Sequence, residues 1–104
     1  MVKIVRVSDD GLLAAYVEGR RVGRLFAVLG DDDPTTAYIT DVLVDELYRR
    51  QGVGTALVKE FERFAREHRI TTVRLFMAKD EALPFWESLG YSRTGPNKPR
   101  EKRL

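Results

Sequence analysis

The sequence predicts an α/β protein of the α+β type, in which a mixed, mostly antiparallel sheet carries two helices. Short segments rich in β-branched and aromatic residues, separated by turn residues, make up the first third of the chain. From Gly52 onward the apolar residues recur every three or four positions, and helical and extended patterns then alternate. The expected order is therefore β-β-β-β-α-β-α-β, with room for one more strand at the end.

Four strands are expected before Gly52, at residues 2–7, 12–18, 22–29 and 38–44. Turn residues at 8–11 and 19–20 separate the first three, which predicts an antiparallel meander. The acidic loop that contains Asp31, Asp32 and Asp33 ends at a proline, and such a loop is typical of a solvated turn rather than a cation site.

A helix of about four turns is expected after Gly52, because one apolar stripe runs along it. The stripe consists of Val53, Ala56, Leu57, Phe61, Phe64 and Ala65. His68 and Arg69 supply cationic groups at its C-terminal end, where the helix dipole favours them.

The remaining elements are expected to be a strand at 71–77, a helix at 80–89 and two short strands at 91–94 and 100–104. Asp80 is the expected N-cap of this second helix, and Pro84 lies in its first turn. Strand 38–44, the first helix and strand 71–77 form a crossover unit, so these two strands should be parallel neighbours.

Composition limits the classes of function. A chain of 104 residues with 43% hydrophobic and 33% charged residues is expected to form one globular domain, residues 1–104. The lack of cysteine excludes disulfides, thiolate zinc sites and a cysteine nucleophile. No signal peptide and no run of about 18 apolar residues is present, which predicts a cytoplasmic protein without a membrane span.

The charge pattern argues against a nucleic-acid partner. Lys and Arg number 18 against 16 Asp and Glu, and both signs are interspersed along most of the chain. The basic residues near the C-terminus are typical of an exposed edge strand that charge protects from pairing. These residues are Lys98, Arg100, Lys102 and Arg103.

Two glycines one residue apart, Gly52 and Gly54, open the first helix directly after the fourth strand. A helix N-terminus carries unpaired N–H groups and a partial positive charge, and missing side chains let the backbone approach a phosphate. The pattern matches neither a P-loop nor a dinucleotide-binding fingerprint. The glycines are therefore equally consistent with phosphate binding and with close packing of helix on strand.

Two longer runs carry a resemblance to a known family. The run DVLVDELYRRQGVGTALV resembles motif A of the GNAT superfamily of acyl-CoA-dependent N-acetyltransferases, whose signature matches Arg49, Gly52 and Gly54. The run ALPFWESLGY resembles motif B of that superfamily, and the closing EKRL is similar to its last strand. The resemblance covers roughly residues 37–104 and implies the GNAT fold.

The resemblance implies acetyl-CoA as co-substrate and no metal. Backbone N–H groups from 50 to 55 are expected to hold its pyrophosphate, and the main chain at Leu43 and Val44 to pair with its pantetheine arm. Arg49 and Arg50 are expected to add charge, and the alternative for at least one of them is a solvated loop arginine. The expected cofactor-binding residues are Leu43, Val44, Arg49, Arg50, Gln51, Gly52, Val53, Gly54, Thr55, Lys79 and Trp86.

Catalysis in the family requires that the acceptor amine lose a proton and that the CoA thiolate gain one. Asp41 is the expected general base, with a solvent-facing or arginine-paired carboxylate as the alternative. Trp86 stands where many relatives carry a tyrosine acid, and an indole is no acid near neutral pH. Protonation is then left to water, to the amine's own proton, or to Tyr48 or Tyr91. Trp86 is otherwise interpreted as a core aromatic residue.

Relatives usually place two helices between the first two strands, where this chain has only a short turn. The resemblance thus implies an open acceptor site, suited to a protein or peptide amine, or a site completed by a second subunit. A homodimer is expected, because the shortened connection would leave Leu13, Tyr16, Leu25 and Phe26 uncovered.

The function that follows is transfer of an acetyl group from acetyl-CoA to a primary amine, by direct attack, with a protein, peptide or small molecule as acceptor. The alternative is a catalytically weak acyl-CoA-binding module or accessory subunit that keeps the cleft.

Overall fold

The computed structural model describes residues 2–8, 12–30, 32–76 and 78–104. Within them, the strands and helices follow one another in the order that the sequence predicts, with a seventh strand at the end. The strands are β1 (Lys3–Arg6), β2 (Leu13–Val17), β3 (Arg20–Leu29), β4 (Thr36–Val44), β5 (Thr72–Leu75), β6 (Ser92–Arg93) and β7 (Arg100–Arg103). The α-helices are α1 (Val53–Glu67) and α2 (Leu83–Ser88), and 3-10 turns are formed by Glu46–Tyr48 and Asp80–Ala82.

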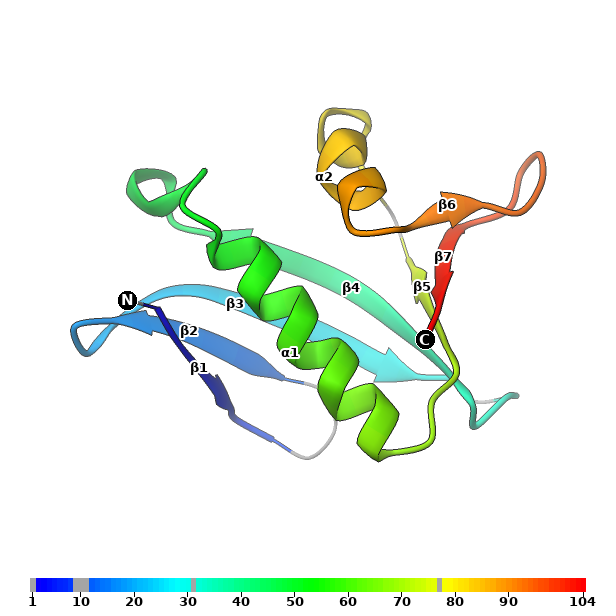
Figure 1. Cartoon of the computed structure of the whole chain (residues 1–104), viewed down its shortest axis with the longest axis horizontal. Coiled ribbons are helices and arrows are strands. Elements are labelled where there is room, and N and C mark those ends of the chain that lie inside the picture. Colours follow the sequence, from blue (N-terminus) through cyan, green and yellow to red (C-terminus); the bar gives the residue numbers. More distant parts are fainter. Residues whose placement is uncertain (1, 9–11, 31, 77) are drawn as a thin grey trace.

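All seven strands join one sheet in the order β1-β2-β3-β4-β5-β7-β6 (Figure 1). The β4–β5 pair is parallel, from Thr36 beside Thr72 to Ile39 beside Leu75, and the other neighbours are antiparallel. The prediction of a mixed, mostly antiparallel sheet with a parallel crossover around α1 is confirmed.

Helix α1 supplies the centre of the core. Its buried face packs on β2, β3 and β4, and it includes Leu57, Val58 and Phe61, which are fully buried. A side chain such as leucine or phenylalanine gains about 1.5–3 kcal/mol when it is fully buried, so this face is a main source of stability. The core also includes Leu13, Ala15, Val22, Leu25, Ala37, Ile39, Ile70, Val73 and Tyr91.

Several element boundaries differ from the predicted ones. β3 begins at Arg20 rather than at residue 22, because Arg20 and Arg21 pair with Val17 and Tyr16 of β2. β4 begins at Thr36 rather than at residue 38, because Thr36 pairs with Thr72 of β5. The predicted turn at 8–11, the acidic loop and the end of the strand at 71–77 include residues 9–11, 31 and 77, which lie outside the described residues.

The predicted helix at 80–89 is wrong in its first part. Asp80–Ala82 form a 3-10 turn, and α2 covers only Leu83–Ser88. Pro84 has no N–H to donate to the carbonyl four residues earlier, which interrupts the hydrogen-bond ladder between the two segments. Asp80 is not the N-cap, since Ala82 precedes α2 and makes no side-chain capping bond.

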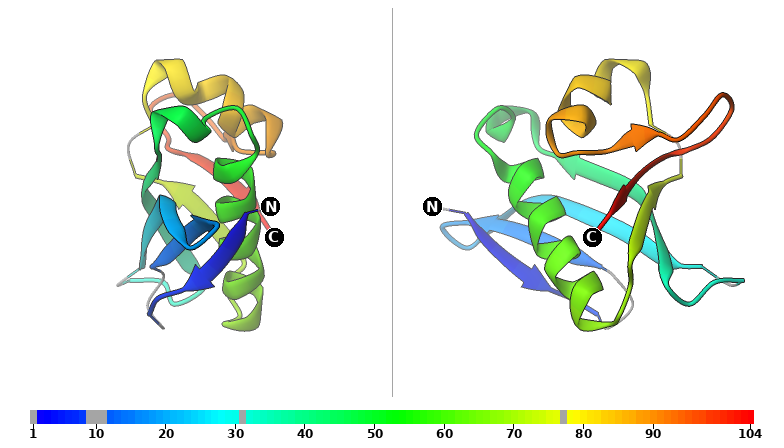
Figure 2. Two further views of the ribbon diagram at one scale, coloured as in Figure 1. Left: turned by 90° about the vertical axis from the view of Figure 1, so that its left-hand side faces the viewer. Right: turned by 45° about the vertical axis from the view of Figure 1, so that its right-hand side comes forward.

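The sheet has one covered face. Figure 2 shows α1 against one side of the sheet, and neither α1 nor α2 lies against the opposite side. The expectation that Leu13 and Leu25 are left uncovered is wrong, because both point toward α1 and are buried. Tyr16 and Phe26 are half-buried. Among the described residues, no helix has the length and apolar character that a membrane crossing requires.

Asp33, in the acidic loop, organises the turn that leads into β4. Its carboxylate accepts hydrogen bonds from the amide and hydroxyl of Thr35, at 2.9 and 2.6 Å, and from the hydroxyl of Thr36, at 3.0 Å. These hydrogen bonds, above all the one from the Thr35 hydroxyl, hold the pKa of Asp33 below its usual value. The interpretation of this loop as a turn is consistent with these bonds.

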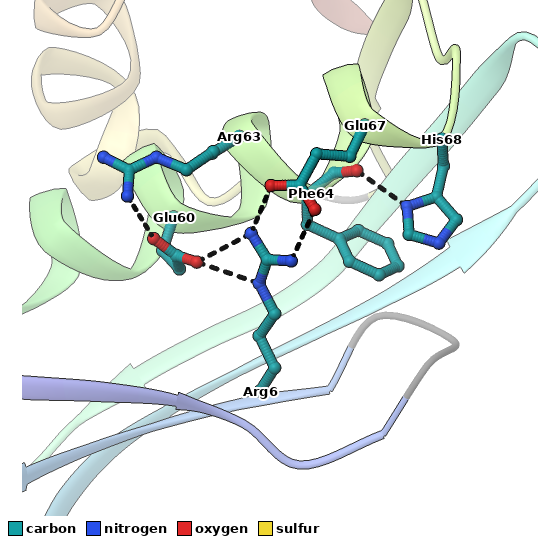
Figure 3. Close-up of polar contacts among 6 residues, drawn as sticks. All are labelled: Arg6, Glu60, Arg63, Phe64, Glu67 and His68. Carbon is teal, nitrogen blue, oxygen red and sulfur yellow. Dashed lines mark hydrogen bonds and ion pairs between the residues drawn. The ribbon is translucent and has the colours of Figure 1, made fainter.

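Arg6 attaches the edge strand β1 to α1 (Figure 3). Its guanidinium donates to Glu67 at 2.7 and 3.0 Å and to Glu60 at 2.9 Å, and it lies 5.6 Å from the centre of the Phe64 ring. Arg63 approaches Glu60 from the other side at 3.4 Å. The hydrogen bond from Arg6 lowers the pKa of Glu67. The edge strand is therefore held by a bidentate, charge-assisted contact as well as by the β2 ladder.

This contact predicts a pH-dependent effect on stability. Replacing Arg6 with Met should lower the Tm at pH 7, where Glu67 is ionised in both states. Since the pKa of Glu67 is lower in the folded than in the unfolded chain, its stabilisation is present above the unfolded value of about 4.3 and is lost as the pH falls through the folded value. Thermal melts at pH 7 and pH 3 should show the Tm of variant and wild type converging at the lower pH.

The matched control is Arg63→Met, whose more exposed guanidinium makes a single longer contact, so it should change the Tm little. If Arg6→Met lowers the Tm equally at both pH values, packing over Phe64 rather than the ion pair attaches β1.

Candidate functional site: a groove along the second half of β4

The groove forms where β4 and β5 part. The β4–β5 ladder ends at Ile39 and Leu75, while β4 continues to Val44 with β3 as its ladder partner in the part of the chain that the structure describes. Helix α2 lies beyond the end of β5 (Figure 1). A cavity of about 450 Å³ lies between this second half of β4, the start of α1 and α2. A strand with one free edge beside a cavity can accept an extended ligand as an added strand.

The connection from β4 to α1 shapes one end of this groove. Arg50 and Gly52 both have a positive φ, of 62° and 82°, which turns the chain sharply before α1 begins at Val53. Gly52 is the N-cap residue and has no side chain to bond the first amides of the helix. The positive end of the α1 dipole therefore faces the groove without a side-chain cap. We call Arg49, Arg50 and this helix start the cationic mouth.

Glycine is required at positions 52 and 54 for two different structural reasons. Gly52 occupies the left-handed region, and a Cβ there would meet nothing within 4 Å, so its backbone angle is what requires glycine. At Gly54 a Cβ would lie 3.3 Å from Cζ of Phe85, in α2. The missing side chain lets Phe85 approach the first turn of α1, which is the packing explanation that the sequence left open. Both glycines also line the groove.

Most of the expected cofactor-binding residues come together around the groove. Those that line it are Leu43, Val44, Arg49, Arg50, Gly52, Val53, Gly54, Thr55 and Trp86. Arg49 also donates from Nε to the carbonyl oxygen of Val44, at 3.2 Å, so its side chain folds back over the strand edge.

Two expected residues lie elsewhere. The Gln51 side chain donates to the carbonyl of Leu47 at 3.0 Å and braces the 3-10 turn Glu46–Tyr48 instead of lining the groove. Lys79 lines the neighbouring cavities described next.

The groove adjoins a second opening. A smaller cavity of about 180 Å³ shares Val42, Leu43 and Trp86 with the groove and reaches Thr40 and Asp41. It adjoins in turn a wide surface hollow of about 760 Å³, lined by Thr40, Asp41, Phe76, Ala78, Lys79, Asp80 and Glu81. We call Asp41, Asp80 and Glu81 the acidic mouth. Two arginines and one carboxylate, Glu81, thus line the groove, whereas three carboxylates and one cation, Lys79, line the hollow.

Asp41 is placed by an irregularity in β4. Asp41 pairs with Phe26 and Ile39 with Ala27, so Thr40 is an extra residue in β4 relative to β3. The Thr40 hydroxyl donates to the carbonyl of Phe26 at 3.2 Å. Such a bulge re-aims the side chains that follow it. Asp41 is exposed and lines both the small cavity and the wide hollow.

Trp86 serves both of the roles considered for it. It is 7% exposed, packs edge-on against Phe85 and Tyr91, and lines both the groove and the small cavity. The two interpretations, core aromatic and groove wall, are therefore compatible.

Tyr91 is wrong as a candidate proton donor. Its side chain is fully buried, its hydroxyl donates to Glu62 at 2.8 Å, and it lines none of the cavities described above. Burial, with the Glu62 charge, raises the pKa of Tyr91 far above its usual value. Tyr48, the other candidate, does line the groove.

Four residues that line the groove were given no role at the site by the sequence: Val42, Glu81, Ala82 and Phe85. Phe85 and Val42 could have been predicted from the sequence, because each is adjacent to an expected cofactor-binding residue, Trp86 and Leu43. Glu81 and Ala82 could not, because their place at the passage depends on the break between the 3-10 turn and α2.

Comparison with known proteins identifies a family for this chain. The model of the acetyltransferase (GNAT) family matches residues 3–91. A curated relative, GCN5-related N-acetyltransferase 2, chloroplastic, from Arabidopsis thaliana, is 38% identical over 60 residues, which are 58% of this chain and 23% of the relative. The chain thus matches less than a quarter of that relative's length.

Solved structures share the fold. Ard1 from Thermoplasma volcanium superimposes with a TM-score of 0.78 and 29% identity, over 90% of this chain and 70% of that one. The PaiA N-acetyltransferase from Thermoplasma acidophilum, in complex with coenzyme A, gives a TM-score of 0.76 and 17% identity, over 89% of this chain and 60% of that one. With the family match spanning most of the sequence, the chain belongs to the acetyltransferase (GNAT) family.

Proposed function

We propose that this protein transfers an acetyl group from acetyl-CoA to a primary amine by direct attack of the amine on the thioester. The observation that supports this most is the passage beside β4, which joins a cationic mouth to an acidic mouth. An anionic cofactor and a cationic acceptor can enter such a passage from opposite ends, each toward charges that attract it.

In this proposal the cationic mouth holds the cofactor's phosphates. The free amides from Arg50 through Thr55 supply donors at the N-terminus of α1, and Arg49 and Arg50 add charge. The pantetheine arm lies along Leu43 and Val44 as an added strand. The carbonyl of Val44 then exchanges its bond from Arg49 for one from the arm, which frees Arg49 to turn toward the phosphates.

The acceptor enters through the acidic mouth. A primary amine is protonated at neutral pH and is attracted by Asp41, Asp80 and Glu81, whose charge exceeds that of Lys79. Asp41, directly or through water, accepts the proton that the amine must lose before its nitrogen attacks the thioester carbon. The open hollow suits an amine on a peptide or protein as well as on a small molecule.

The carbon–sulfur bond then breaks, and the CoA thiolate leaves and takes a proton. The Trp86 indole cannot supply that proton. Water or Tyr48, which lines the groove, supplies it. A thiol with a pKa of about 8.5 is a tolerable leaving group near neutral pH, so the absence of a strong acid does not prevent turnover. An indole at the place where relatives carry a tyrosine also supports the second candidate function, an acyl-CoA-binding module with weak or no turnover.

We propose, in addition, that the protein forms a homodimer through the sheet face opposite α1. Val28 is an exposed large apolar residue and Phe26 is half-buried, and both belong to β3, whose alternate residues point toward α1. Burying such a surface against a second copy would remove it from water.

A first prediction concerns cofactor binding. Coenzyme A and acetyl-CoA should both raise the Tm of the wild type, whereas Gly54→Glu should abolish the shift, because it places a carboxylate in the first turn of α1 and bulk against Phe85 in the groove. The matched control is Gly95→Glu, which adds the same group in the turn between β6 and β7 and should keep the shift. If coenzyme A raises the Tm of Gly54→Glu as much as that of the wild type, the phosphates do not bind at the cationic mouth.

A second prediction concerns proton transfer. Asp41→Asn should lower the acetylation rate by about 10²–10⁴-fold at pH values at which the amine is protonated, and less as the amine loses its proton unaided. Rates across pH, followed by mass spectrometry of the acetylated amine, give the profile. Trp86→Phe should keep most of the turnover. An equal loss of rate in Asp41→Asn at every pH would contradict the role of Asp41 as a base. A wild type that binds acetyl-CoA but acetylates none of a panel of amines would favour the binding module.

A third prediction concerns assembly. Light scattering at micromolar concentration should give the mass of a dimer for the wild type and of a monomer for Val28→Glu. The control is Leu47→Glu, at a more exposed apolar residue in the Glu46–Tyr48 turn, which should stay dimeric. A monomer mass for the wild type contradicts this interface.

A further inference from the structure

Glu62 is a buried carboxylate that the proposed reaction does not use. It lies in the middle of α1, is 4% exposed, and is surrounded along the helix by buried apolar side chains such as Val58, Phe61 and Ala65. It lines none of the cavities beside β4 described above. Burying an ionised carboxylate costs several kcal/mol unless it is paired and hydrogen-bonded. The groups that pair with Glu62 should therefore explain why a carboxylate is buried there.

Two residues from the C-terminal part of the chain satisfy Glu62. The hydroxyl of Tyr91, which follows α2, donates to Oε2 at 2.8 Å. The ammonium of Lys102, in β7, donates to Oε1 at 3.0 Å and to Oε2 at 3.2 Å, and it lies 5.9 Å from the centre of the Tyr91 ring. We call Glu62, Tyr91 and Lys102 the anchor. It joins α1 to the segment after α2 and to β7, which local sequence does not connect.

Within the anchor, Tyr91 contacts Trp86, a residue that lines the groove. The ring of Tyr91 packs edge-on against Trp86, with ring centres 5.2 Å apart and planes at 74°. The amide of Tyr91 also donates to the carbonyl of Trp86 at 3.1 Å. Trp86 lines both the groove and the small cavity that leads to Asp41. Glu62 is thus one hydrogen bond and one ring contact away from the wall of the passage.

Helix α2 needs such an anchor. It has six residues, no side-chain cap at its N-terminus and a proline in its first turn. A helix of this length has no stability of its own in water, so tertiary contacts must determine where it lies. Its other groove residue, Phe85, packs against Trp86 and lies beside the first turn of α1, where Gly54 has no side chain.

We propose that Glu62 is a positioning residue for the groove: through Tyr91 and with Lys102 it holds Trp86 and α2 at the distance from β4 at which the passage fits its ligand. The part of this inference that concerns the ligand rests on the proposed function, whereas the part that concerns Trp86 does not. A purely structural ion pair would add stability and leave the position of Trp86 unchanged.

The sequence contains one tryptophan, so tryptophan fluorescence, excited where tyrosine does not absorb, reports Trp86 alone. Glu62→Gln removes the charge at constant shape, and Tyr91→Phe removes only the hydroxyl and keeps the ring against Trp86. Either variant serves if the other fails to fold. Leu13→Ala is the control, because Leu13 is buried under α1 and lines none of the described cavities. It should lower the Tm as much as the anchor variants or more.

The first readout is acrylamide quenching of Trp86 fluorescence without ligand, well below each Tm. Quenching should increase in Glu62→Gln and Tyr91→Phe and stay at the wild-type level in Leu13→Ala. The second readout is the Kd for coenzyme A from the fluorescence of Trp86, which should rise about tenfold in the anchor variants and stay unchanged in the control.

Unchanged quenching in both anchor variants overturns the inference, whatever the ligand does. Increased quenching with an unchanged Kd also overturns it, since the position of Trp86 would then not matter for binding. If the wild type itself does not bind coenzyme A, the proposed function fails, and the quenching result alone decides whether the anchor positions Trp86.

Discussion

The limited pairing between β4 and β5 is the constraint on which the site depends. Their parallel ladder extends over four residue pairs and ends at Ile39 and Leu75. Beyond that point β4 has only β3 as its ladder partner among the described residues, the Thr40 bulge sets the direction of Asp41, and α2 lines the groove beside β4. A fully paired β5 would fill this edge and leave neither groove nor passage.

The opening is held in place from both sides. On one side, α1 rests on β2, β3 and β4 through a fully buried apolar face, and Arg6 ties the edge strand to it. On the other side, α2 is a short segment that depends on contacts with its neighbours, above all Phe85 beside Gly54 and Tyr91 bonded to Glu62. The side built on α1 carries the cationic mouth, and the side built on α2 carries Trp86.

The fold was predictable because its signals are periodic and local. The change of hydrophobic period at Gly52 and the glycine and proline turns determine the order of elements, and the crossover around α1 determines the parallel pair. The break before α2 was missed because Pro84 was interpreted as a first-turn residue of one longer helix. The burial of Leu13 and Leu25 was missed because alternation along a strand does not say which face a helix covers. The pairing of Glu62 with Tyr91 and Lys102 joins residues 29 and 40 positions apart, which no local pattern encodes.

The central claim is that acetyl-CoA lies along the second half of β4 with its phosphates at the start of α1. An amide-resolved NMR titration of the ¹⁵N-labelled protein with coenzyme A tests it most directly. We expect the largest changes in chemical shift at the amides of Gly52 to Thr55, with smaller changes at the amides of Leu43 and Val44 and at the Trp86 indole N–H. Saturable changes confined to the basic C-terminal strand, or no changes at millimolar coenzyme A, would contradict the account.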